Sequence, residues 1–244
     1  MPILLSTAPP SPLSLLIIGP AGVGKSTLAS LFPSPYWLDF DHNLAGPKKV
    51  WDSTFKKPCP IVYDQVDVDD AGKAVEIPMQ YSRLAKLVTA ARTCPDYKTL
   101  VFDSTTLMSD VFIGEVLRQS PTKTGRMEIP SWGQYLELWK EFTARNRSCG
   151  KNTIYIAHEV VEKNDKDQVV RHSLALPGKI AEILPALFTD VWRCEVTTKM
   201  EGGKSVPVRQ IRTIQSALHP GLKSSLLTPD VFEVTPETIS KLLP

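Results

Sequence analysis

Short apolar runs alternate with longer amphipathic stretches through the first two hundred residues of the chain. Apolar runs of strand length recur at 13–19, 36–41, 99–104, 153–158 and 190–196. Stretches with helical periodicity separate them at 25–31, 78–93, 105–118 and 132–148. Strands and helices that alternate in this way form a mostly parallel sheet with right-handed crossovers and helices on both faces. The pattern therefore predicts an α/β fold built on a twisted, mostly parallel sheet.

Some segments depart from this alternation. A polar loop is expected at 119–131, and two short strands are expected within 160–177. Near the C-terminus the pattern favours antiparallel strands and a short final helix, with Thr235 as its N-cap and proline in its first turn. Residues 1–12 are rich in Pro, Ser and Thr and are interpreted as an N-terminal arm, a candidate oligomerisation segment. We expect one domain over residues 13–244.

Composition narrows the class of protein only in part. The chain has 244 residues, 42 % of them hydrophobic, which is enough for a full core, and its net charge of +2 does not select a partner. Four cysteines lie far apart without a CxxC pair, a pattern that argues against a zinc site and suits a reducing cytosol. The apolar run at 13–18 falls well short of the roughly 20 residues that span a bilayer. A cytoplasmic protein without membrane partners is expected.

A glycine-rich motif follows the first predicted strand and has the form GxxxxGK[ST]. It and the next residue comprise Gly19, Pro20, Ala21, Gly22, Val23, Gly24, Lys25, Ser26 and Thr27. Its glycines let successive backbone N–H groups point inward at phosphates. Lys25 is expected to reach the β- and γ-phosphates, Ser26 to bind Mg²⁺, and Thr27 to lie beside the α-phosphate. The motif predicts a P-loop nucleoside triphosphatase that uses ATP and Mg²⁺; a chance glycine-rich turn is the alternative.

The chemistry of a magnesium-bound triphosphate calls for an acidic residue as well as the phosphate-binding loop. Such a site needs a carboxylate at the end of a neighbouring strand, and the apolar run 100–102 ends in Asp103. Asp103 is therefore the candidate Walker B residue and, with Ser26, the candidate metal site. The alternative is that Asp103 or Ser104 caps the next helix.

The segment Trp37-Leu38-Asp39-Phe40-Asp41-His42-Asn43-Leu44 resembles the D-x-E-H-like end of the second core strand in RecA-like recombinases. Over residues 13–230 the chain resembles the short RecA-core, AAA-domain proteins of bacteriophages, the Sak-type single-strand annealing proteins. That resemblance implies an ATPase stimulated by single-stranded DNA that acts in phage recombination by annealing or strand exchange. It also implies a homo-oligomer, as filament or ring, in the host cytoplasm, with a single-strand-binding protein as a further candidate partner.

The same resemblance assigns roles to two strand ends. Asp41 stands where the family places the glutamate that polarises the attacking water, although Asp is shorter than Glu. His158 ends a strand whose last polar residue senses the γ-phosphate in the family. The alternatives are that Asp39 and Asp41 begin a solvated loop, and that His158 satisfies a backbone group at its strand end.

The family's DNA-binding loops correspond to 119–131 and 159–177 here. Their candidate phosphate contacts are Lys123, Arg126, Lys163, Lys166 and Arg171, with His172. Trp132 and Tyr135 offer stacking faces beside the first loop. Lys223 is the candidate basic residue that completes a neighbour's site, with Arg212 as second choice. A solvated, mixed-charge hairpin and ordinary surface charge are the alternatives.

Other functions share the phosphate-binding loop. A helicase loader or replicative ATPase is one alternative, and a P-loop small-molecule kinase is another. A nucleotide-dependent regulatory module that binds a protein partner is a third. Stimulation of ATP hydrolysis by single-stranded DNA would separate the recombination and loader hypotheses from the kinase and regulatory ones.

Overall fold

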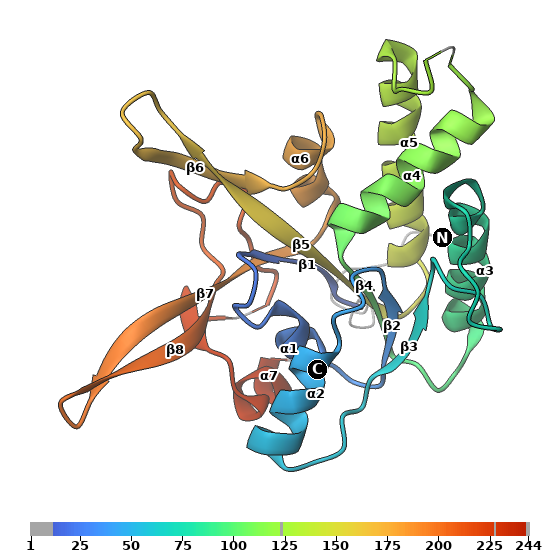
Figure 1. Cartoon of the computed structure of the whole chain (residues 1–244). Coiled ribbons are helices and arrows are strands. Elements are labelled where there is room, and N and C mark those ends of the chain that lie inside the picture. Colours follow the sequence, from blue (N-terminus) through green and yellow to red (C-terminus); the bar gives the residue numbers. More distant parts are fainter. Residues whose placement is uncertain (1–11, 123, 227, 243–244) are drawn as a thin grey trace, which may run out of the picture.

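The computed structural model describes residues 12–122, 124–226 and 228–242, and the strands among them form one nine-stranded sheet. Along the sheet the order is β3-β2-β4-β5-β1-β7-β8-β9, and β6 pairs with β5 (Figure 1). The strands are β1 (Ser14–Gly19), β2 (Pro35–Asp39), β3 (Val62–Gln65), β4 (Thr99–Asp103), β5 (Asn152–Lys163), β6 (Val169–Leu174), β7 (Asp190–Glu201), β8 (Lys204–Arg212) and β9 (Val231–Glu233). The arm at 1–11 and Lys123 lie outside the described residues.

The sheet has a parallel part and an antiparallel part. Strands β3, β2, β4, β5, β1 and β7 pair in parallel, whereas β8, β9 and β6 join by antiparallel pairing. Parallel strands need long crossover connections, which the intervening helices supply. The predicted fold class, a mostly parallel α/β sheet with antiparallel strands near the C-terminus, is confirmed.

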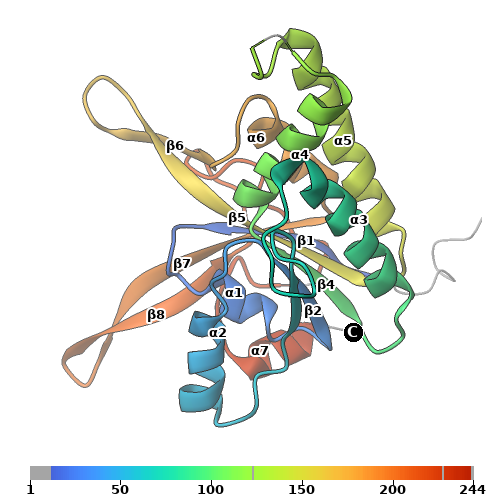
Figure 2. The same cartoon turned by 45° about the vertical axis from the view of Figure 1, so that its right-hand side comes forward.

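Helices cover both faces of the sheet, and the alternation of side chains along β1 shows how. Leu16 and Ile18 belong to a buried cluster that includes side chains from α3, α4 and α5, whereas Leu15 and Ile17 pack in a second cluster with side chains from α1 and α7. Figure 2 shows α3, α4 and α5 together on one side of the sheet. The helices are α1 (Lys25–Ala29), α2 (Ala45–Val50), α3 (Ile77–Thr93), α4 (Thr105–Gln119), α5 (Ile129–Arg147), α6 (Ile180–Ile183) and α7 (Pro236–Leu242).

Two strands are longer than their apolar runs predict. β5 continues past residue 158 to pair with β6, and β7 continues past residue 196 to pair with β8. Each pair projects from the sheet as a hairpin, and both views show the two hairpins as separate protrusions (Figures 1 and 2). The β5–β6 hairpin confirms the two short strands predicted within 160–177, whereas the mostly exposed outer half of β7 was not predicted.

The region between β2 and α3 was not predicted at all. It contains α2, a π-helical turn at Trp51–Phe55, and the edge strand β3. Only Pro47 is buried in α2, and no residue of β3 is buried, so the segment carries little apolar periodicity. At the other end of the chain, the Thr235 hydroxyl accepts the backbone N–H of Thr238 at 3.1 Å, which confirms the predicted N-cap of α7.

A close backbone contact joins β1 to β7 at the point where β1 ends. A Cβ atom on Gly19 would lie 2.5 Å from the carbonyl oxygen of Cys194, and the φ angle of Gly19 is +148°. Real Cβ atoms do not approach backbone oxygens so closely, and side chains other than hydrogen rarely adopt this φ. Only glycine therefore allows β7 to lie this close to the start of the phosphate-binding loop.

Gly19→Ala is expected to lower the free energy of unfolding by about 3 kcal/mol, because the new methyl group must displace backbone rather than a flexible side chain. Urea denaturation followed by tryptophan fluorescence measures the change. Gly46→Ala is the control, since no heavy atom lies within 4 Å of its added Cβ. Equal stability of the two variants would contradict the importance of the contact.

Candidate functional site

The carboxyl ends of β1, β2, β4 and β5 meet at a pocket of about 190 Å³. In a parallel sheet this edge is where ligands ordinarily bind, because the loops after neighbouring strands converge there. The pocket brings together the predicted site residues of four separate segments. Its lining consists of Ala21, Gly22, Gly24, Lys25, Ser26, Thr27, Asp41, Asn43, Gly46, Pro47, Val50, Asp103, His158 and Arg209.

The phosphate-binding loop curls between β1 and α1 as its glycines predict. Gly22 and Gly24 have φ angles of +77° and +98°, conformations that a side chain would strain. Lys25 is buried and donates hydrogen bonds from Nζ to the carbonyl oxygens of Gly19 at 2.9 Å and Pro20 at 2.8 Å. Burial lowers the pKa of Lys25, and nearby acidic groups oppose that change. The ammonium is thus held at the loop by backbone oxygens.

Ser26 and Asp103 are in direct contact at the floor of this site. The Ser26 hydroxyl donates to Oδ2 of Asp103 at 2.7 Å. Asp103 is only 6 % exposed, and burial raises its pKa to about 7 despite that hydrogen bond. A hydroxyl and a carboxylate side by side are the oxygen ligands that Mg²⁺ takes in nucleotide sites. This oxygen pair beside the loop fits the predicted metal site.

His158 lies between Lys25 and Asp41. Its Nδ1 is 3.4 Å from Nζ of Lys25, and its Nε2 is 3.3 Å from Oδ2 of Asp41. An ammonium can only donate and a carboxylate can only accept, so both contacts are satisfied by a neutral imidazole with its proton on Nε2. His158 therefore connects the loop lysine to the carboxylate at the end of β2.

Asp41 is held by the loop that follows β4. Its Oδ1 accepts the backbone N–H of Ser104 at 3.1 Å and the Ser104 hydroxyl at 2.8 Å. Burial pushes the pKa of Asp41 upward, but hydrogen bonds from His158 and Ser104 together outweigh burial and leave the pKa below its ordinary value. The Asp41 carboxylate is therefore ionised and oriented at the pocket wall.

Asp39, by contrast, is part of the sheet. It is 2 % exposed, it lies opposite Asp103 in the pairing of β2 with β4, and it does not line the pocket. Burial raises the pKa of its carboxyl group. The alternative in which Asp39 and Asp41 begin a solvated loop is therefore wrong for Asp39.

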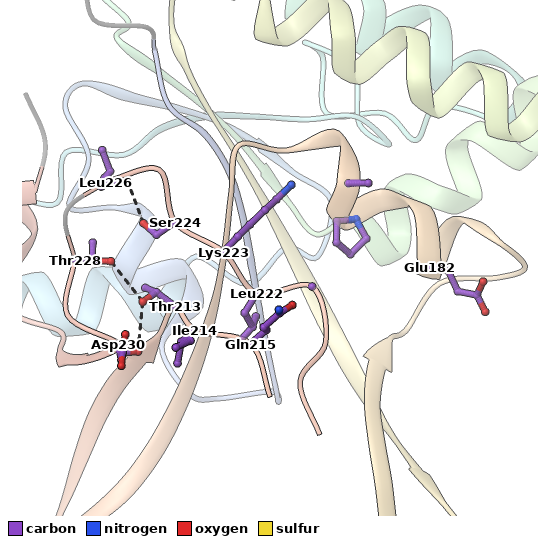
Figure 3. A pocket seen from close by; sticks show the side chains of 13 residues that line it. Glu182, Thr213, Ile214, Gln215, Leu222, Lys223, Ser224, Leu226, Thr228 and Asp230 are labelled. Atoms are coloured by element: carbon purple, nitrogen blue, oxygen red, sulfur yellow. Dashed lines mark hydrogen bonds between the residues drawn. The ribbon is translucent and has the colours of Figure 1, made fainter. Parts of the chain in front are cut away.

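Lys223 lies away from the phosphate-binding loop of its own chain. It pairs with Val191 in an isolated bridge and lines a different pocket of about 620 Å³, which shares no residue with the loop pocket. Figure 3 shows its side chain extending away from Thr213 and Asp230. The second choice, Arg212, donates to Glu195 at 2.9 Å. Neither cation reaches the pocket within one chain.

The candidate DNA contacts fall on two protrusions. Arg126 is exposed in the connection from α4 to α5, and Lys163 and Lys166 are exposed at the end of the β5–β6 hairpin. Arg171 is half-buried on β6, and Lys163 forms an ion pair with Asp167 at 2.8 Å. The two protrusions lie apart in both views (Figures 1 and 2).

One predicted stacking residue is not available at the surface. Tyr135 is fully buried, and its hydroxyl is 2.6 Å from that of Ser109. The interpretation of Tyr135 as a stacking face is therefore wrong: its position on α5 turns the ring into the core, toward Trp139. Trp132 is half-buried and packs edge-on against Tyr135.

Sequence reasoning missed Arg209 and the wall made by α2. Arg209 comes from β8, far along the chain from the loop that it approaches. Pro47 and Val50 supply apolar surface to the same pocket. The one signal in the sequence is the alternation of Arg209 with Ile211, which places both on one face of β8.

Asp103→Asn is expected to stabilise the metal-free protein at pH 8 by on the order of 2 kcal/mol. The folded pKa near 7 lies above the ordinary value of 3.8, so the contribution of Asp103 to wild-type stability is fully present below pH 4 and is lost as the pH rises through 7. Urea denaturation in EDTA should show this fall for wild type and a flatter profile for the variant. Asp165→Asn, at an exposed turn, is the control. Parallel profiles for Asp103→Asn and wild type would contradict the raised pKa.

No described helix combines the length and apolar character needed to cross a membrane. A comparison with curated proteins finds no match to the chain. Among solved structures, a KaiC-like protein from the hyperthermophilic archaeon Pyrococcus horikoshii OT3 is similar, at 13 % identity and a TM-score of 0.45 over 86 % of this chain and 83 % of that one. A family model described as an AAA domain matches residues 11–221, which include the phosphate-binding loop and every strand that lines the pocket. The chain therefore belongs to the AAA domain family of P-loop ATPases.

Proposed function

We propose that this protein is a magnesium-dependent ATPase that single-stranded DNA stimulates, and that it acts in recombination by strand annealing or strand exchange. The observation that carries the ATPase part is the convergence of Lys25, the Ser26–Asp103 pair and the Asp41–His158 pair in one pocket. The DNA part rests on the resemblance to phage RecA-core proteins and on the place of His158 at the root of a projecting hairpin.

Each residue has a chemical task in this proposal. Lys25 leaves the carbonyl oxygens of Gly19 and Pro20 and neutralises charge on the β- and γ-phosphates. Ser26 and Asp103 would hold Mg²⁺, which would offset negative charge that develops on the phosphates. Asp41, ionised and fixed by Ser104, orients the attacking water. Hydrolysis thus depends on the positions of Ser26, Asp41 and Asp103 in the fold and on the movement of Lys25 to the phosphates.

His158 supplies the connection to DNA. Its neighbour on β5, Glu159, is buried and bonded to Arg193 at 2.7 Å and to His172 on β6 at 3.1 Å. When Lys25 turns toward a triphosphate, it gives up the contact with His158, so the strand end meets a different set of hydrogen bonds in the two states. β5 then continues to Lys163, where its register with β6 shifts and where DNA phosphate is proposed to bind.

Asp41→Asn is expected to reduce ATP turnover by about 100-fold, because the amide cannot accept the proton of water as a carboxylate can. The dissociation constant for ATP should change less than about threefold. Single-turnover hydrolysis and calorimetry measure the two quantities. Ser104→Ala is the matched control: it removes one anchor of Asp41 but keeps the carboxylate, and it should slow turnover less. Equal losses of binding and turnover in Asp41→Asn would assign Asp41 a structural role instead.

Single-stranded DNA is expected to raise the ATPase rate of the wild-type chain, with Lys25→Ala as the inactive control. Replacing both Lys163 and Lys166 by Glu should abolish stimulation by oligo-dT and leave the DNA-free rate unchanged, because the two lysines lie outside the nucleotide pocket. The matched control replaces Lys199 and Lys204, on the β7–β8 hairpin, by Glu. An ATPase that oligo-dT does not stimulate would overturn the DNA part and favour a kinase or regulatory module.

A further inference from the structure

Arg209 lies directly over the phosphate-binding loop. A Cβ atom on Gly24 would meet Cδ of Arg209 at 3.0 Å and Nε at 3.1 Å. The side chain lines the same pocket as Lys25, Ser26 and Asp103, although it comes from the antiparallel part of the sheet. Glycine at position 24 therefore leaves room for a guanidinium as well as allowing the turn of the loop.

The backbone around Arg209 fixes this position from both sides. Arg209 pairs with Val196 of β7, and its carbonyl oxygen accepts the backbone N–H of Val234 at 3.1 Å. Ile211, two residues on and so on the same face of β8, is fully buried in the cluster that contains Leu28 of α1. The face of β8 that carries Arg209 is thus the face that packs against the loop helix.

The guanidinium group of Arg209 has no protein partner among the described residues, and its side chain is exposed. The other arginines of β7 and β8 differ in this respect. Arg193 binds Glu159 and Glu195, and Arg212 binds Glu195. A cation that is held beside a ligand pocket and left unpaired there is available to an anionic ligand.

The charge of the pocket supports the same reading. Lys25 is the one other cation among the residues that line it, and a triphosphate brings more negative charge than one ammonium offsets. Arg209 supplies a second positive charge, and its planar group carries five N–H donors that match the oxygens of phosphate.

We propose that Arg209 binds the phosphates of the nucleotide within its own chain, as a second cation beside Lys25. This inference rests on the proposed function, because it requires that the pocket take ATP. It assigns to β8 a phosphate contact made in cis, in addition to any residue that a neighbouring subunit supplies. An arginine can also stack on a base, so the test must separate phosphate contact from base contact.

Inorganic tripolyphosphate, which has no base, makes that separation. Calorimetry with Mg²⁺ should show that Arg209→Ala weakens binding of both tripolyphosphate and ATP by at least about tenfold, the effect of one lost charge-assisted hydrogen bond. Arg209→Lys should restore part of each affinity, since it keeps the charge but not the planar fork. Lys204→Ala, on the same strand but outside the pocket, is the control and should bind both as wild type does.

Two results would overturn different claims. If wild type binds tripolyphosphate and Arg209→Ala binds it equally well, the phosphate contact is refuted, and a loss of ATP affinity alone would assign Arg209 to the base. If wild type binds neither ATP nor tripolyphosphate, the proposed ATP site itself fails. A thermal unfolding curve for each variant identifies any loss of binding that comes from misfolding.

Discussion

The geometry of the nucleotide pocket depends on the approach of the Gly19 backbone to the carbonyl oxygen of Cys194. This contact sets where β1 ends, and therefore where the phosphate-binding loop begins. It also brings β7, and with it β8, to the side of the loop. Burial raises the pKa of the Cys194 thiol to about 12, so the sulfur is a neutral part of this packing. Because residue 19 has no side chain, β7 can pack beside the start of the loop, and the antiparallel strand β8 that pairs with β7 lies close to the site as well.

The pocket is also an electrostatic compromise. Burial disfavours the charged form of Asp103 and raises its pKa. Asp41, by contrast, is kept ionised by hydrogen bonds from Ser104 and His158. Two neighbouring carboxylates thus have opposite protonation tendencies because their partners differ. A divalent cation beside Ser26 would favour the charged form of Asp103 and offset this effect of burial. Binding of a metal ion there would therefore be linked to the stability of the fold.

The sequence predicted those parts of the site that depend on local pattern. The loop from Gly19 to Thr27 is a contiguous motif, and Asp41, Asp103 and His158 follow apolar runs whose parallel pairing brings their ends together. Arg209 could not be predicted in this way, because its place depends on a hairpin that folds back on the loop from far along the chain. The functional roles of Asp41, Asp103 and His158 remain predictions.

The elements and residues that were predicted wrongly, or not at all, also have specific physical causes. The segment that forms α2 and β3 buries little, so it lacks the periodicity that reveals elements. Tyr135 was interpreted by its nearness in sequence to a polar loop, but the helical repeat of α5 directs it inward with Trp139. The outer half of β7 was not predicted as strand because most of its residues are exposed and polar.

β5 is one strand from the pocket to the end of its hairpin, so the displacement from a small tilt at its pocket end would be larger at its far end. His158 lies near the pocket end of the exposed half of the strand. Lys163 lies five residues further along, which corresponds to about 16 Å along an extended strand. A tilt of about 10° at His158 would move Lys163 by about 3 Å, the length of one hydrogen bond. A small rearrangement at the pocket would therefore be enough to exchange one set of contacts for another at the far end of the hairpin.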